Sequence, residues 1–120
     1  MSIQLSPLHD RLARKLGLGG PTFDTLFVES VNDVSRDLNR QCFQEVDDVD
    51  DQNATIDLDV MFYPAYREGV SYYMQSSGEI SREPDPNAYA KYQRALAECQ
   101  YNAIEELDLS TGTNDSNWGE

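Results

Sequence analysis

Acidic side chains form the densest group of chemically capable residues in this chain of 120 residues. Six carboxylates stand close together, at Glu45, Asp47, Asp48, Asp50, Asp51 and Asp57. Ca²⁺ prefers such ligands, and a twelve-residue calcium loop would find oxygen donors at its first, third, fifth and twelfth positions, at Asp48, Asp50, Gln52 and Asp59. The sixth position is Asn53 rather than glycine, and the last is aspartate rather than a bidentate glutamate. We therefore interpret the segment as a solvated loop and predict no metal site.

Nucleophilic and acid–base chemistry has few candidate residues. The chain holds one histidine, His9, and two widely separated cysteines, Cys42 and Cys99. No glycine-rich phosphate loop follows a predicted strand, and no ligand spacing suits zinc. We predict that the chain is not an enzyme and has no catalytic or cofactor-binding residues. Both cysteines are expected to be small buried hydrophobic residues, and a disulfide between them stays open.

Tyrosines are the other side chains with a potential role in binding. There are seven, at positions 63, 66, 72, 73, 89, 92 and 101. They could pack in a core or an interface, or they could form a base-stacking platform. Stacking platforms come with a positive groove that holds the nucleic-acid backbone. The net charge of -13 has the wrong sign for that, so packing is the favoured explanation.

The negative charge is distributed unevenly. Residues 1–20 carry a net +2, residues 21–60 carry -9 and residues 61–120 carry -6. Such a surface repels phosphates, which argues against sequence-specific DNA binding and suits a basic partner or a conduit that must not retain DNA. No apolar run approaches the roughly 18 residues that span a bilayer, and no signal-peptide region is visible. We expect a soluble, cytosolic single domain without membrane contact.

The clearest predicted helix covers residues 23–43 and must position many of these groups. Its apolar residues recur at helical spacing, at Phe23, Phe27, Val31, Val34 and Leu38. Thr22 is the expected N-cap, and Asp24 stands in the first turn, where the helix dipole favours negative charge. Polar residues, Asp37 among them, fall on the opposite face. The apolar stripe therefore needs partners from other segments.

A short helix is predicted before it, starting at Ser6 and Pro7 and ending at Gly17. The glycines that follow, at positions 17, 19 and 20, suggest a hinge that would let this helix dock on a neighbouring molecule. Whether it packs in its own subunit stays open. Residues 55–59 alternate in polarity and fit either a short strand or an extended lead-in.

Two more helices are predicted in the second half of the chain. One covers residues 61–76, and its central Gly69 indicates close approach of another helix. The other begins after a turn at residues 84–86 and carries an apolar stripe formed by Tyr89, Tyr92, Leu96, Cys99 and Ala103.

The sequence thus predicts an all-α fold, a small helical bundle of three main helices plus a short N-terminal helix, with an extended loop and a C-terminal tail. We expect an N-terminal helix and glycine hinge over 1–20, a helical domain over 21–109 and a flexible tail over 110–120. The tail is polar and aperiodic. Its Trp118 is either incidental or an anchor that orders on a partner.

The order of these features resembles the head-to-tail connector (adaptor, head completion) proteins of tailed bacteriophages. The likeness covers roughly residues 22–105 and rests on pattern, with no signature motif. Its residues are Phe27, Ser30, Val31, Asn32 and Leu38, then Ile56 and Leu58, then Tyr63, Pro64, Ala65, Gly69, Tyr72 and Tyr73, and finally the Pro84–Pro86 turn, Tyr89, Tyr92, Ala95 and Leu96. The N-terminal helix has no counterpart in this comparison.

The resemblance implies an adaptor domain that assembles as a ring, a dodecamer, between the portal and the tail and extends the DNA channel. Expected partners are further copies of the chain, the portal protein, a tail or neck protein, and passing double-stranded DNA that is not specifically bound. The location implied is the virion neck, and the host cytoplasm during assembly. No cofactor is implied.

Three groups of residues are assigned on this basis. Portal or partner contacts are expected from Trp118, Asn117 and Asn114. Contacts between subunits are expected from Tyr72, Tyr73, Tyr89 and Tyr92. The channel is expected to be lined by Asp47, Asp48, Asp50 and Asp51, because a negatively lined channel offers DNA no cations to bind.

Two alternatives remain open at this stage. An acidic DNA mimic that blocks a DNA-binding protein would have this size and charge, but it would space carboxylates regularly over one surface, which Arg36, Arg40 and other bases interrupt. A generic helical interaction module would be a stable monomer or dimer.

Overall fold

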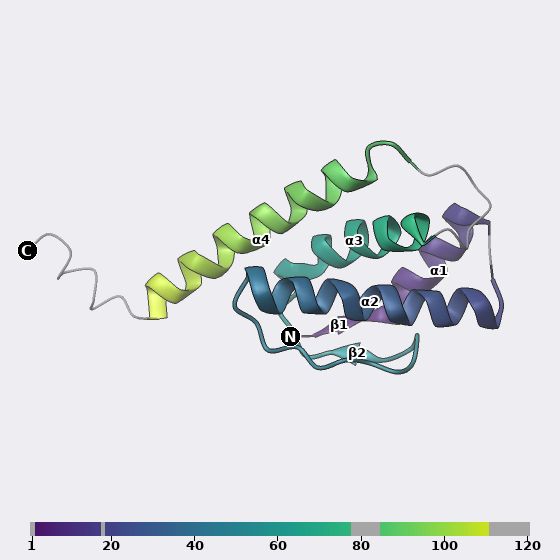
Figure 1. Ribbon diagram of the computed structural model, residues 1–120. Helices are drawn as coiled ribbons and strands as arrows, with labels where there is room; N and C mark the ends of the chain where they lie inside the picture. Colours follow the sequence, from purple (N-terminus) through teal and green to yellow (C-terminus); the bar gives the residue numbers. More distant parts are fainter. Residues whose placement is uncertain (1, 18, 78–84, 111–120) are drawn as a thin grey trace, which may run out of the picture.

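The computed structural model describes residues 2–17, 19–77 and 85–110. In order, these form strand β1 (Ile3–Gln4), helix α1 (Leu5–Leu16), helix α2 (Pro21–Gln41), strand β2 (Thr55–Ile56), a 3₁₀ turn η1 (Val60–Phe62), helix α3 (Tyr63–Ser76) and helix α4 (Ala88–Ser110). The fold is all-α with one two-stranded ribbon, so the predicted fold class is confirmed. Figure 1 shows α3 lying between α2 and α4, while the segment containing β2 runs along the other side of α2.

Helix α2 is the centre of the core, as its apolar stripe predicts. All five stripe residues are at most 4% exposed. The predicted cap is wrong: the N-cap is Gly20, at φ 92°, and Pro21 stands at the first helical position, so Thr22 lies inside the helix. Proline suits that position because its missing N–H would have no partner there. The helix ends at Gln41 with Cys42 as its C-cap, and Phe43 follows with a positive φ of 61° and an exposed ring.

The N-terminal segment belongs to the same core. Its leucines Leu5, Leu8, Leu12 and Leu16 are all buried, and Gly17 closes α1 in the left-handed conformation. β1 pairs antiparallel with β2, with Ile3 opposite Ile56, and the N–H of Leu5 donates to the carbonyl of Ala54 (3.1 Å). The helix therefore begins at Leu5, ahead of the predicted Ser6–Pro7 start, and packs on its own chain rather than leaving its leucines for a neighbour.

Residues 55–59 contain both predicted alternatives in succession. A two-residue strand is followed by Asp59, whose carboxylate accepts a hydrogen bond from the N–H of Met61 (2.9 Å) and caps η1. α3 then starts with Pro64 in its first turn, where proline is tolerated.

Gly69 lies where other helices approach closely, as predicted. A Cβ at this position would lie 2.5 Å from Cε1 of Tyr92 and 2.6 Å from Cγ2 of Val34. Only glycine lets α3 fit between α2 and α4 at this depth.

Helix α4 buries only part of its length. Tyr92, Leu96, Cys99 and Ala103 are buried as predicted, but Tyr89, predicted on the same stripe, is 56% exposed. Toward its C-terminus α4 extends beyond the ends of the other helices (Figure 1). Tyr101 and Ile104 of α4 are also exposed, at 64% and 44%.

Candidate partner-binding surfaces

The acidic segment, residues 45–51, is an extended strap fixed to α2. Asn39 and Asn32 hold it through paired hydrogen bonds to its backbone. The amide of Asn39 donates to the carbonyl of Val46 (3.0 Å) and accepts from the Val46 N–H (2.7 Å). The amide of Asn32 likewise donates to the carbonyl of Val49 (2.9 Å) and accepts from the Val49 N–H (2.8 Å). We refer to residues 45–51 below as the acidic strap.

The two asparagines match the strap in spacing. They are seven residues apart on a helix that rises 1.5 Å per residue, a separation of about 10 Å. Val46 and Val49 are three residues apart on an extended chain that rises about 3.3 Å per residue, also about 10 Å. Two side-chain amides thereby replace a neighbouring strand and satisfy backbone groups that would otherwise need water.

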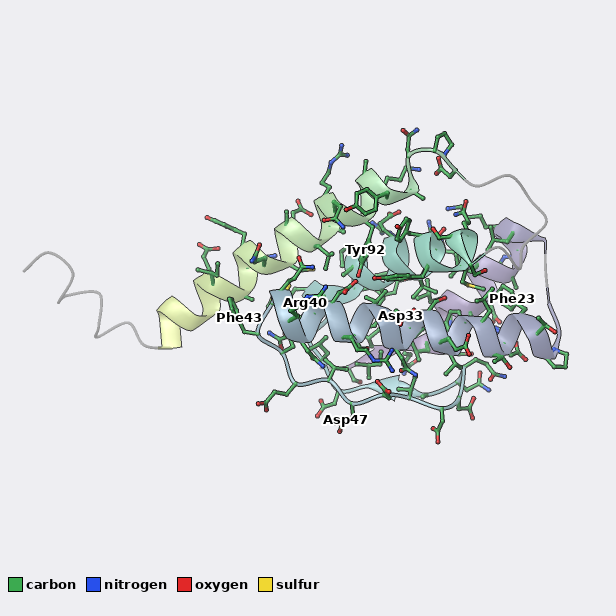
Figure 2. The ribbon with its side chains drawn as sticks, viewed as in Figure 1. Phe23, Asp33, Arg40, Phe43, Asp47 and Tyr92 are labelled. Atoms are coloured by element: carbon green, nitrogen blue, oxygen red, sulfur yellow. The ribbon has the colours of Figure 1, made fainter. Side chains whose placement is uncertain are left out.

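This attachment leaves the acids of the strap facing outward. Glu45, Asp47, Asp48, Asp50 and Asp51 are all exposed, whereas Val46 and Val49 are half-buried. Asp47 projects from the strap away from α2 (Figure 2). Arg36 bridges Asp48 and Asp33, each at 3.0 Å, and neutralises part of the charge. The four predicted channel acids therefore share one fixed, solvent-facing segment.

The calcium alternative finds no supporting geometry. Within the described ranges, no three His, Cys, Asp or Glu residues are close enough to share a metal ion. Asp59 is engaged at the start of η1, and Asp51 accepts a hydrogen bond from the N–H of Asn53 (2.8 Å).

A buried carboxylate joins three elements on the opposite side of α2. Asp37 is 8% exposed, contrary to its predicted place on the solvent face. It accepts hydrogen bonds from the hydroxyls of Tyr73 (2.5 Å) and Tyr92 (2.6 Å) and from Arg40 (2.9 Å). Burial, and secondarily the adjacent carboxylate, raise the pKa of both tyrosines well above its ordinary value. Asp37 of α2 is thus hydrogen-bonded to side chains of both α3 and α4.

The predicted interface tyrosines divide into two groups. Tyr92 is 1% exposed inside a single chain, so its assignment to a subunit interface is wrong: its ring fills the space above Gly69 and its hydroxyl is held by Asp37. Tyr73 is half-buried and also bonded to Asp37. Tyr72 contacts the ring of Tyr89 with centroids 5.3 Å apart, and these two retain surface that a partner can reach.

A groove runs along the exposed side of α4. It encloses about 670 Å³ and is lined by Met61, Pro64, Arg94, Ala97, Glu98, Cys99, Tyr101 and Asn102. Tyr101 is 64% exposed. No groove was predicted here from the sequence, although the position of Tyr101 off the apolar stripe of α4 was a signal for one.

Cys42, Cys99 and His9 all lie in packed surroundings. Cys42 and Cys99 are free and buried, as predicted, and burial raises the pKa of each thiol to about 11. His9 lies against the rings of Phe23 and Phe27, with Nε2 2.6 Å from Oδ1 of Asp24. These contacts tie α1 to α2.

The predicted portal contacts Trp118, Asn117 and Asn114 lie outside the described residues. No helix in the described part of the chain is long and apolar enough to cross a membrane. In comparisons with known proteins, no family model, no curated protein and no solved structure matches the chain.

Proposed function

We propose that this chain is an architectural subunit, a head-to-tail connector that assembles into a ring between a phage portal and tail and extends the DNA channel. The observation that carries the proposal is the acidic strap. Asn32 and Asn39 fix the backbone of the strap on α2, and its carboxylates point outward. In a ring these carboxylates would present negative charge to the channel, while the strap itself stays attached to its helix.

A ring would multiply this charge. DNA passing through a negatively lined channel meets no cations that could replace its counterions, so it slides without being retained. Ring contacts are heterologous and require two different faces on each subunit. Exposed aromatic residues stand on two separate elements, Phe43 just after α2 and Tyr89 near the start of α4, which suits contacts of that kind.

Light scattering over a range of protein concentrations, alone and with a purified portal, tests the proposal. We expect assembly into rings visible by electron microscopy, or capture by the portal. A chain that stays monomeric throughout and leaves the portal unbound would overturn it.

The strap also supports a second candidate, an acidic DNA mimic, because it fixes several carboxylates on one surface. Replacing Asp47, Asp48, Asp50 and Asp51 together by asparagine separates the two. A connector would still assemble into rings and bind the portal, because in this proposal the strap acids line the channel and make no contact between subunits. A mimic would lose binding to its DNA-binding target, and duplex DNA would compete with the unmodified protein for that target.

A further inference from the structure

The groove on α4 has a volume of about 670 Å³, and the proposed function makes no use of it. Its floor and walls are largely apolar, from Met61, Pro64, Ala97 and the ring of Tyr101, and Arg94 and Glu98 stand among them. Met61 and Pro64 are half-buried and Tyr101 is exposed, so the apolar surface is accessible from solvent. A concave surface with an apolar lining and a few charged groups is the kind of site that takes an aromatic side chain.

We propose that the groove is the docking site of the chain's own residues 111–120, with the indole of Trp118 seated against Tyr101 and Met61. The segment follows directly on α4, the helix that forms one wall of the groove. Trp118 is the single tryptophan of the chain, in an otherwise polar sequence. A large aromatic ring is the type of side chain that contributes most to binding in an apolar groove.

The length of the segment fits this placement. Tyr101 lies nine residues before Ser110, about 14 Å along a helix that rises 1.5 Å per residue. The eight residues from Ser110 to Trp118 reach about 28 Å when extended. The segment can therefore reverse at Gly112, where no side chain restricts the backbone, and return along α4 to the groove.

Charge complementarity sets the direction of the returning segment. Arg94 lies seven residues before Tyr101, about 10 Å further along α4 in the direction of travel. Glu120 follows Trp118 by two residues and so would come within reach of the Arg94 guanidinium. Docking within one molecule is also favoured over docking between molecules, because a short tether gives an effective concentration of order mM.

The proposal goes beyond ring assembly and has its own readout, since all tryptophan fluorescence comes from Trp118. The full chain is compared with a synthetic peptide of residues 110–120, by emission maximum and by acrylamide quenching. We expect the full chain to emit at shorter wavelength and to be quenched less than the peptide. Equal values for the chain and the peptide would overturn the proposal.

Two matched variants locate the site. Tyr101→Glu places a charge inside the groove and is expected to shift emission and quenching to the values of the peptide. Gln100→Glu adds the same charge at the neighbouring position, which is exposed and outside the groove, and is expected to leave both unchanged. Tyr101 is 64% exposed, so circular dichroism should find the fold of both variants intact. Persistence of the protected spectrum in Tyr101→Glu would refute the site.

A dilution series distinguishes the occupant. Protection that is independent of concentration supports docking within one molecule. Protection that disappears on dilution, together with a fall in mass by light scattering, would assign the groove to the tail of a second copy and overturn the proposal as stated.

Discussion

The hydroxyl of Tyr92 donates a hydrogen bond to the carboxylate of Asp37 across 2.6 Å, joining residues that are 55 positions apart in the chain. The same carboxylate accepts hydrogen bonds from the hydroxyl of Tyr73 and the guanidinium of Arg40. A buried carboxylate is tolerated only where hydrogen bonds or charges compensate its lost hydration. This small polar cluster therefore fixes how α3 and α4 sit on α2.

Tyr92→Phe should destabilise the protein by about 1.5–3 kcal/mol, because it removes a hydrogen bond to a buried charged group. Urea unfolding followed by circular dichroism measures the change. Tyr89→Phe, on the same helix but exposed, serves as the control and should change the free energy of unfolding by less than about 0.5 kcal/mol. Equal effects of the two variants would contradict the role of Asp37.

Gly69→Ala should destabilise the protein even though alanine is the better helix former. The new methyl group would lie within 2.6 Å of buried atoms of Tyr92 and Val34, and relief requires the helices to move apart. Overpacking of this kind lowers the free energy of unfolding by about 1–3 kcal/mol. The better helix propensity of alanine raises it by only about 1 kcal/mol, so we expect a net loss of stability. Thermal unfolding of Gly69→Ala is compared with that of Gly19→Ala, where the methyl group meets no atom within 4 Å. A Gly69→Ala protein as stable as the unmodified chain would show that the helices separate at little cost.

Asn39→Ala should release one end of the acidic strap. Two hydrogen bonds to the Val46 backbone are lost, a local cost of about 1–3 kcal/mol. Hydrogen exchange is the direct measurement, and the amide of Val46 should exchange faster while amides in the middle of α3 keep their protection. Asn87→Ala, at an exposed site before α4, is the control and should leave Val46 unaffected. Unchanged exchange at Val46 in Asn39→Ala would mean that the strap is held by other contacts.

Stability should fall at alkaline pH. Burial raises the pKa of Cys42 from 9.0 to about 11 and that of Tyr66 from 10.0 to about 12. The unfolded chain then loses these protons at a lower pH than the folded chain, so their stabilisation is complete below pH 9 and is lost as pH rises to 12. The melting temperature against pH measures this, and Cys42→Ala should flatten the decline between pH 9 and pH 11. An identical slope in the variant would exclude a contribution from this thiol.

The sequence predicted the elements that depend on local spacing. The stripe from Phe23 to Leu38 determined α2, the leucines before Gly17 determined α1, and Gly69 marked a close helix contact. These predictions held because helix periodicity and the steric freedom of glycine are properties of the chain itself. The predicted helix caps were wrong, since Gly20 and Gln4 are the N-caps in place of Thr22 and Ser6.

The tertiary structure alone decided which polar residues are inside. Asp37 appears on the solvent face of an isolated helix, yet it is buried because tyrosines from two later helices reach it. Asn32 also appears on the solvent face and is half-buried, because the acidic strap returns to bind it. A pattern within one helix records only which face is apolar. Whether a polar face meets water or another segment depends on contacts between residues far apart in the chain, and those exist only after the helices have packed.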